Sequence, residues 1–251
     1  MSSVDQLAGG VRAAIEAAAT GPPTPDRKFN EDDEFVAYGL KTDAWRAIMR
    51  GFRPRFAGLS LDERLSLAEA LLAEREGWLG HSGIYVLALS VRKLTPAYFE
   101  RLDRMADDFT SWSHVDDFCI AVAQPLLRSH RDETLVLLER WNRSPNRWKR
   151  RASVVAFVRK VGASGDFTDE ALRLCEILLC DPEDLVRKGV GWALKDVMRG
   201  DPERVLAYVL ELRRRGISST ITLYAIRDLK GRQREEVLGM RPGNVAADIG
   251  R

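Results

Sequence analysis

The chain has 251 residues, of which 45% are hydrophobic and 30% are charged, and its net charge is +2. This composition is ordinary for a globular protein, and so small a charge does not by itself indicate a nucleic-acid partner. The amino terminus has no basic flank followed by an apolar core, and no run approaches the ~18 apolar residues of a membrane span. We therefore expect neither a signal peptide nor a membrane partner.

Cysteine and histidine usage excludes two further classes of protein. The three cysteines form no CxxC pair, and the three histidines are scattered. Disulfide frameworks and zinc sites need regular spacings of these residues. We therefore expect no metal site, and we expect buried thiols in a reducing cytosol.

Helical periodicity runs through almost the whole chain, whereas strand signals are nearly absent. The first predicted helix covers 4–19, and a Pro/Gly break at 21–25 and an exposed acidic turn at 30–34 follow it. A second helix begins near Thr42, which we predict as its N-cap. Further helices are predicted at 60–74, 81–94, 95–109, 112–128, 131–142, 146–161, 168–180, 183–199, 202–215 and 219–230.

Two of these helices carry sequence signals for their first turn. Ser60 is followed by Glu63, which fits a capping box. Thr95 precedes a proline at the first helical position. The connections between helices are short, and short connections favour antiparallel neighbours. The sequence therefore predicts an all-α fold of stacked helix pairs.

Three stretches, at 111–117, 144–154 and 181–194, share one design: each opens a predicted helix with a tryptophan, a charge or both. Their spacing of about 36 residues suits a solenoid of helix pairs, in which equivalent positions form one wall. The residues placed on this wall are Trp112, Asp116, Trp148, Arg151, Lys188 and Trp192. We predict one domain over 1–251, a HEAT-like solenoid of about six antiparallel helix pairs with a concave basic cleft and a loose tail at about 231–251.

Basic residues are concentrated on one part of this wall. The segment 140–160 contains eight Lys and Arg residues and no acidic ones. Such a run is usually a solvated face, but its overlap with the wall favours contact with phosphates. A polyanion would respond to this segment rather than to the chain average.

Trp112 and Asp116 are four residues apart and therefore share one helix face. The carboxylate is a candidate for chemistry, and the alternative is a structural ion pair with one of the arginines at 150–151. His114 lies two residues from Trp112, so it turns away from this face. We assign His114 a solvated or packing role rather than that of a general base.

The remaining tryptophans have both a packing and a binding interpretation. Trp148 and Trp192 could each be interhelical core. Trp192 follows Gly191, and a glycine inside a helix costs about 1 kcal/mol relative to alanine, which a close backbone approach would explain. Tyr38, before a predicted break, is assigned to the border of the cleft. We assign mainly to packing Trp45, Trp78 and Trp141.

Five segments, at 38–50, 81–94, 111–118, 146–155 and 187–197, occur in the order found in a known family. In them the chain resembles the DNA alkylation repair enzyme family, whose AlkD-like members are HEAT-repeat DNA glycosylases. The resemblance implies that Trp112 supplies an indole, Asp116 the catalytic carboxylate and Trp192 the second indole of the cleft. It places Arg151 on the DNA backbone, and we add to this DNA-binding set Arg147, Lys149, Arg150, Lys188, Trp148 and Tyr38.

The sequence departs from the family pattern in one place, because Ser111 and Ser113 stand where many members have tryptophan and aspartate. The resemblance implies excision of cationic N3- or N7-alkylated purines from duplex DNA by hydrolysis of the N-glycosidic bond, in base excision repair and without a cofactor. We expect a monomer in the bacterial cytosol or nucleoid. The alternatives are a non-catalytic HEAT-like protein that recognises bent or branched DNA, and a protein-interaction scaffold without a basic stripe.

Overall fold

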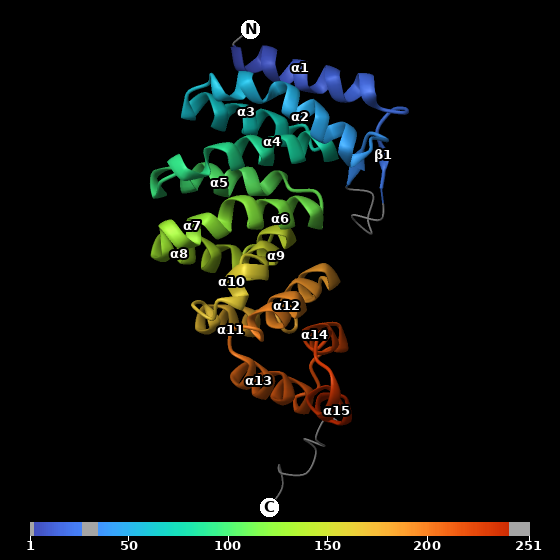
Figure 1. Cartoon of the computed structure of the whole chain (residues 1–251), viewed down its shortest axis with the longest axis vertical. Helices are drawn as coiled ribbons and strands as arrows, with labels where there is room; N and C mark the ends of the chain where they lie inside the picture. The colour runs from blue at the N-terminus through green and yellow to red at the C-terminus, as the bar shows by residue number, and fades with distance from the viewer. Residues whose placement is uncertain (1–2, 27–34, 241–251) are drawn as a thin grey trace, which may run out of the picture. The chain divides into compact units, whose positions relative to one another are not determined.

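The computed structural model describes residues 3–26 and 35–240, and these form an all-α fold (Figure 1). Internal contacts divide the chain into two compact units, unit 1 at 1–137 and unit 2 at 138–251. The prediction of a single solenoid domain stays a prediction. None of the described helices is long and apolar enough to cross a membrane.

Unit 1 is built on helices that pack side by side. Helix α3 lies against α1 and α4, and α4 also packs on α6, so α4 is the most enclosed of them. The elements of unit 1 are α1 (Ser3–Ala18), β1 (Thr24–Pro25), β2 (Val36–Ala37), α2 (Thr42–Ala57), α3 (Leu61–Ala73), α4 (Gly77–Ser90), α5 (Phe99–Met105), α6 (Trp112–Phe118) and α7 (Gln124–Ser129), and α8 (Arg131–Asn142) crosses into unit 2.

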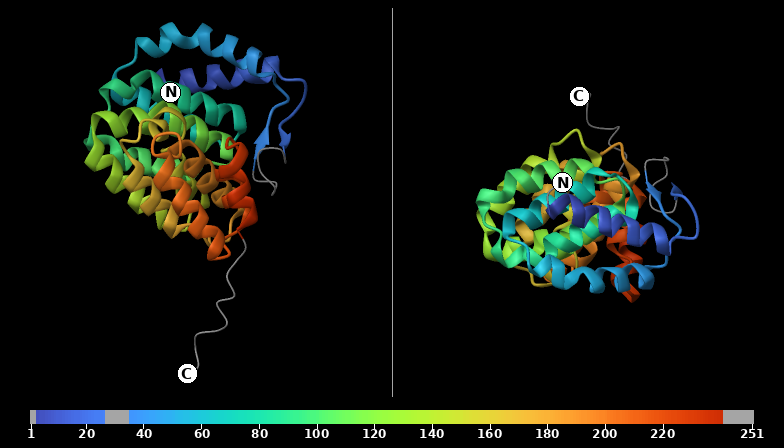
Figure 2. Two further views of the ribbon diagram at one scale, coloured as in Figure 1. Left: turned by 60° about the horizontal axis from the view of Figure 1, so that its bottom comes forward. Right: turned by 90° about the horizontal axis from the view of Figure 1, so that it is seen from above.

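A pair of two-residue strands interrupts the helices of unit 1. Strands β1 and β2 are antiparallel, with Thr24 opposite Ala37, and Val36 also forms a bridge to Glu76 at the start of α4. Figure 2 shows this pair projecting from the ends of α1 and α2. The predicted break at 21–25 therefore contains the strand β1, and the predicted acidic turn at 30–34 lies outside the described residues.

The predicted helix starts were correct in part. The capping box is present, because Glu63 N–H donates to Ser60 Oγ at 3.3 Å and Ser60 N–H donates to the Glu63 carboxylate at 2.8 Å. The prediction for Thr42 was wrong: Lys41 occupies the N-cap position without a side-chain hydrogen bond. Pro96 opens a short 3₁₀ turn, and Thr95 makes no capping bond.

The predicted helix over 112–128 is present but is not regular throughout. Helix α6 continues into a π-helical turn at Cys119–Ala123 and then into α7, whose first turn contains Pro125. A π turn accommodates an extra residue within a helix. The side chains before and after the turn therefore do not share a simple helical register, and only α6 carries the pair that sequence analysis selected.

Unit 2 is centred on α12, which packs against α9, α10, α11 and α14. Its elements after α8 are α9 (Arg147–Val155), α10 (Arg159–Ala163), α11 (Thr168–Ile177), α12 (Asp184–Val197), α13 (Pro202–Arg214), α14 (Ser219–Ala225) and α15 (Gly231–Gly239).

Three predictions for unit 2 were wrong. The helix expected over 146–161 breaks before Arg159, whose φ is +56° and whose backbone N–H donates to Asp196 Oδ2 at 2.7 Å. The loose tail expected from 231 begins with helix α15 instead, and 241–251 lie outside the described residues. Of the thiols expected to be buried, Cys180 is exposed.

Candidate functional site

Helix α6 carries the predicted indole and carboxylate. Its N-cap is Ser111, whose Oγ accepts a hydrogen bond from His114 N–H at 3.2 Å. Trp112 begins the helix and Asp116 follows one turn later, and both side chains are half-buried. Val115, between these two positions, is fully buried. The two residues thus lie at the partly accessible edge of a helix whose other face belongs to the core.

A polar chain that sequence analysis missed joins α6 to α4. His81 Nδ1 donates to Asp117 Oδ2 at 2.9 Å, and His81 Nε2 lies 3.2 Å from Ser113 Oγ, which in turn lies 2.8 Å from Ser111 Oγ. The serines that depart from the family pattern thus take part in this chain. The available signal was the 36-residue offset between His81 and Asp117, which equals one repeat.

His114 has the predicted packing role. Its ring is fully buried, Nε2 donates to Gly77 O at 2.9 Å, and His81 lies edge-on with ring centroids 4.6 Å apart. Burial, together with the nearby His81, lowers the pKa of His114 to about 3. A neutral, enclosed imidazole has no access to a substrate, so His114 is excluded as a general base.

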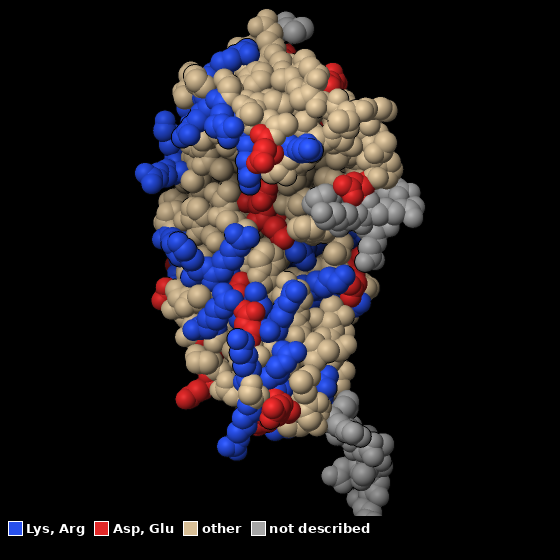
Figure 3. Space-filling view, turned by 45° about the vertical axis from the view of Figure 1, so that its right-hand side comes forward, with Lys and Arg blue, Asp and Glu red and all other residues tan. Residues whose placement is uncertain are grey.

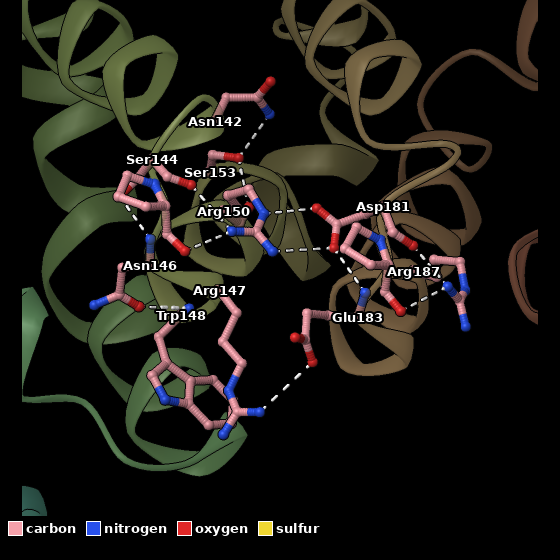
Figure 4. A network of polar contacts seen from close by, with 12 residues as sticks. Asn142, Ser144, Asn146, Arg147, Trp148, Arg150, Ser153, Asp181, Glu183 and Arg187 are labelled. Atoms are coloured by element: carbon pink, nitrogen blue, oxygen red, sulfur yellow. Dashed lines mark hydrogen bonds and ion pairs between the residues drawn. The ribbon is translucent and has the colours of Figure 1, made fainter.

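Arg150 of the basic segment and Arg187 of α12 form a ladder of arginines that bind the protein itself (Figure 4). Arg150 donates to the backbone carbonyls of Ser144 and Pro145 and makes a two-point ion pair with Asp181, at 2.6 and 3.2 Å. Arg187 occurs 37 residues after Arg150 and repeats the arrangement, because it donates to the carbonyls of Asp181 and Pro182. Each arginine therefore fixes the loop that precedes its own helix, and Arg150 also ties that loop to Asp181, just before α12.

Three other residues of the predicted DNA-binding set are largely enclosed. Trp148 is 2% exposed, Lys149 6% and Arg151 5%. Arg151 Nη1 donates to Leu185 O at 2.6 Å and lies against Gly189 of α12. The burial of Lys149 and Trp148 leaves little surface for direct contact with DNA, so the core interpretation of Trp148 is the better one.

The more accessible cations lie at the starts of α9 and α12. Arg147 pairs with Glu183 at 3.5 Å and places its guanidinium 4.7 Å from the Trp148 ring centroid. Lys188 is 43% exposed at its side chain and pairs with Asp184 at 2.7 Å. Figure 3 shows Lys and Arg side chains gathered over the surface that unit 2 presents in this view, with Asp and Glu side chains between them.

Trp192 is half-buried on α12, and the Arg159 guanidinium lies 5.9 Å from its ring centroid. The preceding Gly191 has the close approach that sequence analysis predicted. A Cβ at this position would lie 2.7 Å from Tyr224 Cβ and 3.0 Å from Ile221 O of α14. Gly191 thus allows α12 and α14 to pack in contact while Trp192 keeps part of its ring accessible.

Tyr38 is half-buried and follows β2. Its hydroxyl donates to Glu16 Oε1 at 2.9 Å, and this bond, with smaller contributions from burial and from the negative charge of Glu16, raises the pKa of Tyr38. Trp78 Nε1 donates to Tyr38 O at 3.0 Å. Tyr38 and Trp78 also line a cavity of about 470 Å³ within unit 1.

The predicted site residues divide between the units. Trp112, Asp116 and Tyr38 belong to unit 1, and the others belong to unit 2: Arg147, Trp148, Lys149, Arg150, Arg151, Lys188 and Trp192. Within 3–26 and 35–240, no group of three or more His, Cys, Asp or Glu side chains is arranged to hold a metal ion. The catalytic and DNA-binding roles of these residues stay predictions.

Comparisons with known proteins find similarity over most of the chain. The family model described as DNA alkylation repair enzyme matches residues 13–229. A solved structure described as a predicted DNA alkylation repair enzyme from Enterococcus faecalis is similar with a TM-score of 0.67 and 14% identity, covering 89% of this chain and 95% of that one.

A second similar structure is the Pseudomonas fluorescens alkylpurine DNA glycosylase AlkC bound to DNA containing an abasic site analog. Its TM-score is 0.55 at 16% identity, and the match covers 94% of this chain but 65% of AlkC. No curated protein matches the chain at a significant level of sequence similarity. At these identities the two solved structures establish the fold.

Proposed function

Because the chain belongs to the DNA alkylation repair enzyme family, we propose that it is a DNA glycosylase that excises cationic N3- or N7-alkylated purines from duplex DNA. The observation that carries the proposal is α6, which holds an indole and a carboxylate one turn apart at a half-buried edge. The similar AlkC structure is an alkylpurine glycosylase bound to DNA with an abasic site analog, which supports the same class of substrate.

The chemistry of such a lesion suits this pair of side chains. An alkylated purine already carries a positive charge, which is neutralised as the glycosidic bond breaks, so the departing base needs little acid catalysis. The demand is to stabilise the positive charge that develops on the sugar and to position water. A carboxylate such as Asp116 meets both needs, by electrostatics and by accepting a proton from water. Trp112 and Trp192 offer π faces to a cation.

DNA contact is assigned to the accessible cations of unit 2. Lys188 and Arg147 keep part of their charge at the surface, where they can neutralise phosphates and displace counterions. Arg150 and Arg151 act first on the protein itself, because Arg150 pairs with Asp181 and Arg151 donates to Leu185 O. Their contribution to DNA binding would come from positioning the helix starts.

The deciding experiment is release of the base from duplex DNA that carries N7-methylguanine or N3-methyladenine, with undamaged duplex as the control. We expect release by the wild type and a loss of about 10²–10³-fold in rate for Asp116→Asn, which removes the charge but preserves shape. DNA binding should change little or strengthen, since a negative charge near phosphate is lost. The matched control is Asp132→Asn, at an exposed carboxylate in the first turn of α8.

Two outcomes would contradict the assignment. Unchanged release by Asp116→Asn would remove Asp116 from the reaction. Tight DNA binding by the wild type without any base release would instead favour the alternative of a non-catalytic protein that recognises bent or branched DNA.

A further inference from the structure

Unit 1 contains a cavity that the proposed chemistry does not use. It has a volume of about 470 Å³, within the range of about 300–1,000 Å³ that is typical for small-molecule sites. Its walls come from β1, β2 and the starts of α2 and α4, which the bridge between Val36 and Glu76 brings together. We call it the aromatic pocket, after the rings of Phe35, Tyr38 and Trp78 that line it.

Hydrogen bonds hold the Trp78 indole in place without using its faces. Trp78 Nε1 donates to Tyr38 O, and the Trp78 backbone carbonyl accepts from Ser82 Oγ at 2.7 Å. Trp45 donates from Nε1 to the same hydroxyl at 3.0 Å, and its ring centroid lies 5.8 Å from that of Trp78. The indole is therefore fixed before a ligand binds, and such preorganisation reduces the entropic cost of binding.

The buried cap of α4 stabilises the same wall. Glu76 accepts from the backbone N–H groups of Leu79 and Tyr38, at 2.8 and 2.9 Å. Glu76 is 8% exposed, and this burial raises the pKa of its carboxyl despite these hydrogen bonds. The lining also carries charged groups of both signs, the exposed Lys41 and the half-buried Asp26, together with the exposed Thr42. Aromatic side chains and charged groups in one lining match a flat molecule whose edge carries nitrogen and oxygen atoms.

We propose that the aromatic pocket binds a planar nitrogen heterocycle of purine size, stacked on Trp78 with its polar edge toward Lys41. The inference rests on the proposed function in one respect, because the heterocycle expected in the cell is the alkylated purine. That ring can arrive as the free base released by excision or as an unpaired base still attached to a DNA strand. The ring chemistry is the same in both cases.

His81 gives the pocket a route to α6. It lines the pocket next to Trp78, with ring centroids 5.8 Å apart, and its two nitrogens contact Asp117 and Ser113 of α6. Those residues flank Asp116 and Trp112 in sequence. A ligand in the pocket would therefore affect α6, which carries the proposed catalytic carboxylate, through the His81 side chain.

Binding is measured by equilibrium dialysis of the full chain against free N7-methylguanine and, in a second arm, by titration with a duplex containing one unpaired purine and with a fully paired duplex. We expect Trp78→Leu to weaken binding roughly tenfold, the scale of one base stacked on an aromatic side chain. Lys41→Ala should weaken it about fivefold, as loss of one hydrogen bond does. Arg46→Ala removes an exposed cation of α2 outside the pocket and should bind as the wild type does.

The two arms separate the two sources of the ring, and either result supports the pocket. Failure of the wild type to bind both the free base and the unpaired purine overturns it, as does wild-type binding by both Trp78→Leu and Lys41→Ala. If circular dichroism shows that Trp78→Leu is unfolded, Lys41→Ala decides alone. Asp116→Asn should bind the free base like the wild type. If the wild type binds the free base but releases no base from damaged duplex DNA, the proposed function is refuted and the pocket proposal still stands.

Discussion

Helices α6 and α9 begin in the same way and yet use their tryptophans differently. Each has a side chain that caps its N-terminus, Ser111 for α6 and Asn146 for α9. Trp112 is the first residue after its cap and is half-buried, whereas Trp148 is the second and is 2% exposed. One residue turns a side chain by about 100° around a helix. The position relative to the cap therefore decides whether the indole faces the core or the surface.

The cations show the same divergence between sequence position and exposure. Lys188 and Arg151 are equivalent by their 37-residue offset, but Lys188 is 43% exposed at its side chain and Arg151 is 5% exposed. A family motif thus identifies an aligned position, while the local packing determines whether its side chain can meet a ligand. Substitutions that separate folding from activity are the direct test of this difference.

The largest expected difference is between the two tryptophans. Trp148→Ala should lower the free energy of unfolding by about 3–5 kcal/mol, because it removes a fully packed indole. Trp112→Ala should cost clearly less and slow base release instead. Urea unfolding measured beside the excision assay gives both values. Equal stability losses for the two variants would refute the difference between α6 and α9.

Acid should lower the stability of α6 but not of α9, because α6 contains the buried His114 and α9 has no histidine. The folded-state pKa of His114 is about 3, below the value of about 6.5 for an unfolded chain. Between these values only the unfolded chain binds the proton, so stability falls as the pH decreases from 6.5. The His114 contribution should fall by about 2 kcal/mol between pH 6.5 and pH 5. His114→Gln should show a flatter dependence in urea unfolding over this range, and an unchanged slope would contradict the buried, neutral assignment.

Two glycines provide a smaller test of packing, one in each unit. Gly191→Ala should cost about 1–3 kcal/mol, because its Cβ would lie 2.7 Å from Tyr224 Cβ. Gly51→Ala, inside α2 with no atom within 4 Å of the added Cβ, should gain about 0.5–1 kcal/mol from helix propensity. Thermal melting should show a lower melting temperature for Gly191→Ala and a higher one for Gly51→Ala. A neutral Gly191→Ala would mean that α12 and α14 do not need their close approach.

The smallest effect is expected in the salt dependence of DNA binding. Lys188→Ala should reduce the slope of log affinity against log salt by about 0.9, the value for one lost phosphate contact. Arg151→Ala should leave the slope nearly unchanged and act on stability. Fluorescence titrations at several salt concentrations compare the two variants. The same loss of slope for both would place Arg151 on the DNA backbone, as the family resemblance implies.

The sequence predicted those features that depend on local patterns. The Ser60 capping box, the bounds of α8 and the shared edge of Trp112 and Asp116 follow from spacing within one helix. The break before Arg159 was missed, because a left-handed residue there is stabilised by Asp196, far along the chain. Long-range contacts of this kind leave no periodic signal.

The enclosure of Arg150 and Arg151 was missed for a related reason. A run of cations is read as surface unless its partners are known, and those partners are the backbone carbonyls of Ser144, Pro145 and Leu185 together with Asp181. Every residue has a backbone carbonyl, so the sequence does not indicate which carbonyls accept hydrogen bonds from a given arginine. Only the fold determines which arginine reaches them.

The arginine ladder has a consequence for how unit 2 unfolds. Asp181 accepts from Arg150 of the α9 repeat, and its backbone carbonyl accepts from Arg187 of α12, so one loop is held from both sides. In repeat proteins the coupling between neighbours sets the size of the cooperative block. Helices α9 and α12 should therefore lose hydrogen-exchange protection together rather than one after the other. The positions 37 residues after Asp181 and Arg187 are Ser218 and Tyr224, so the charged ladder ends at α12.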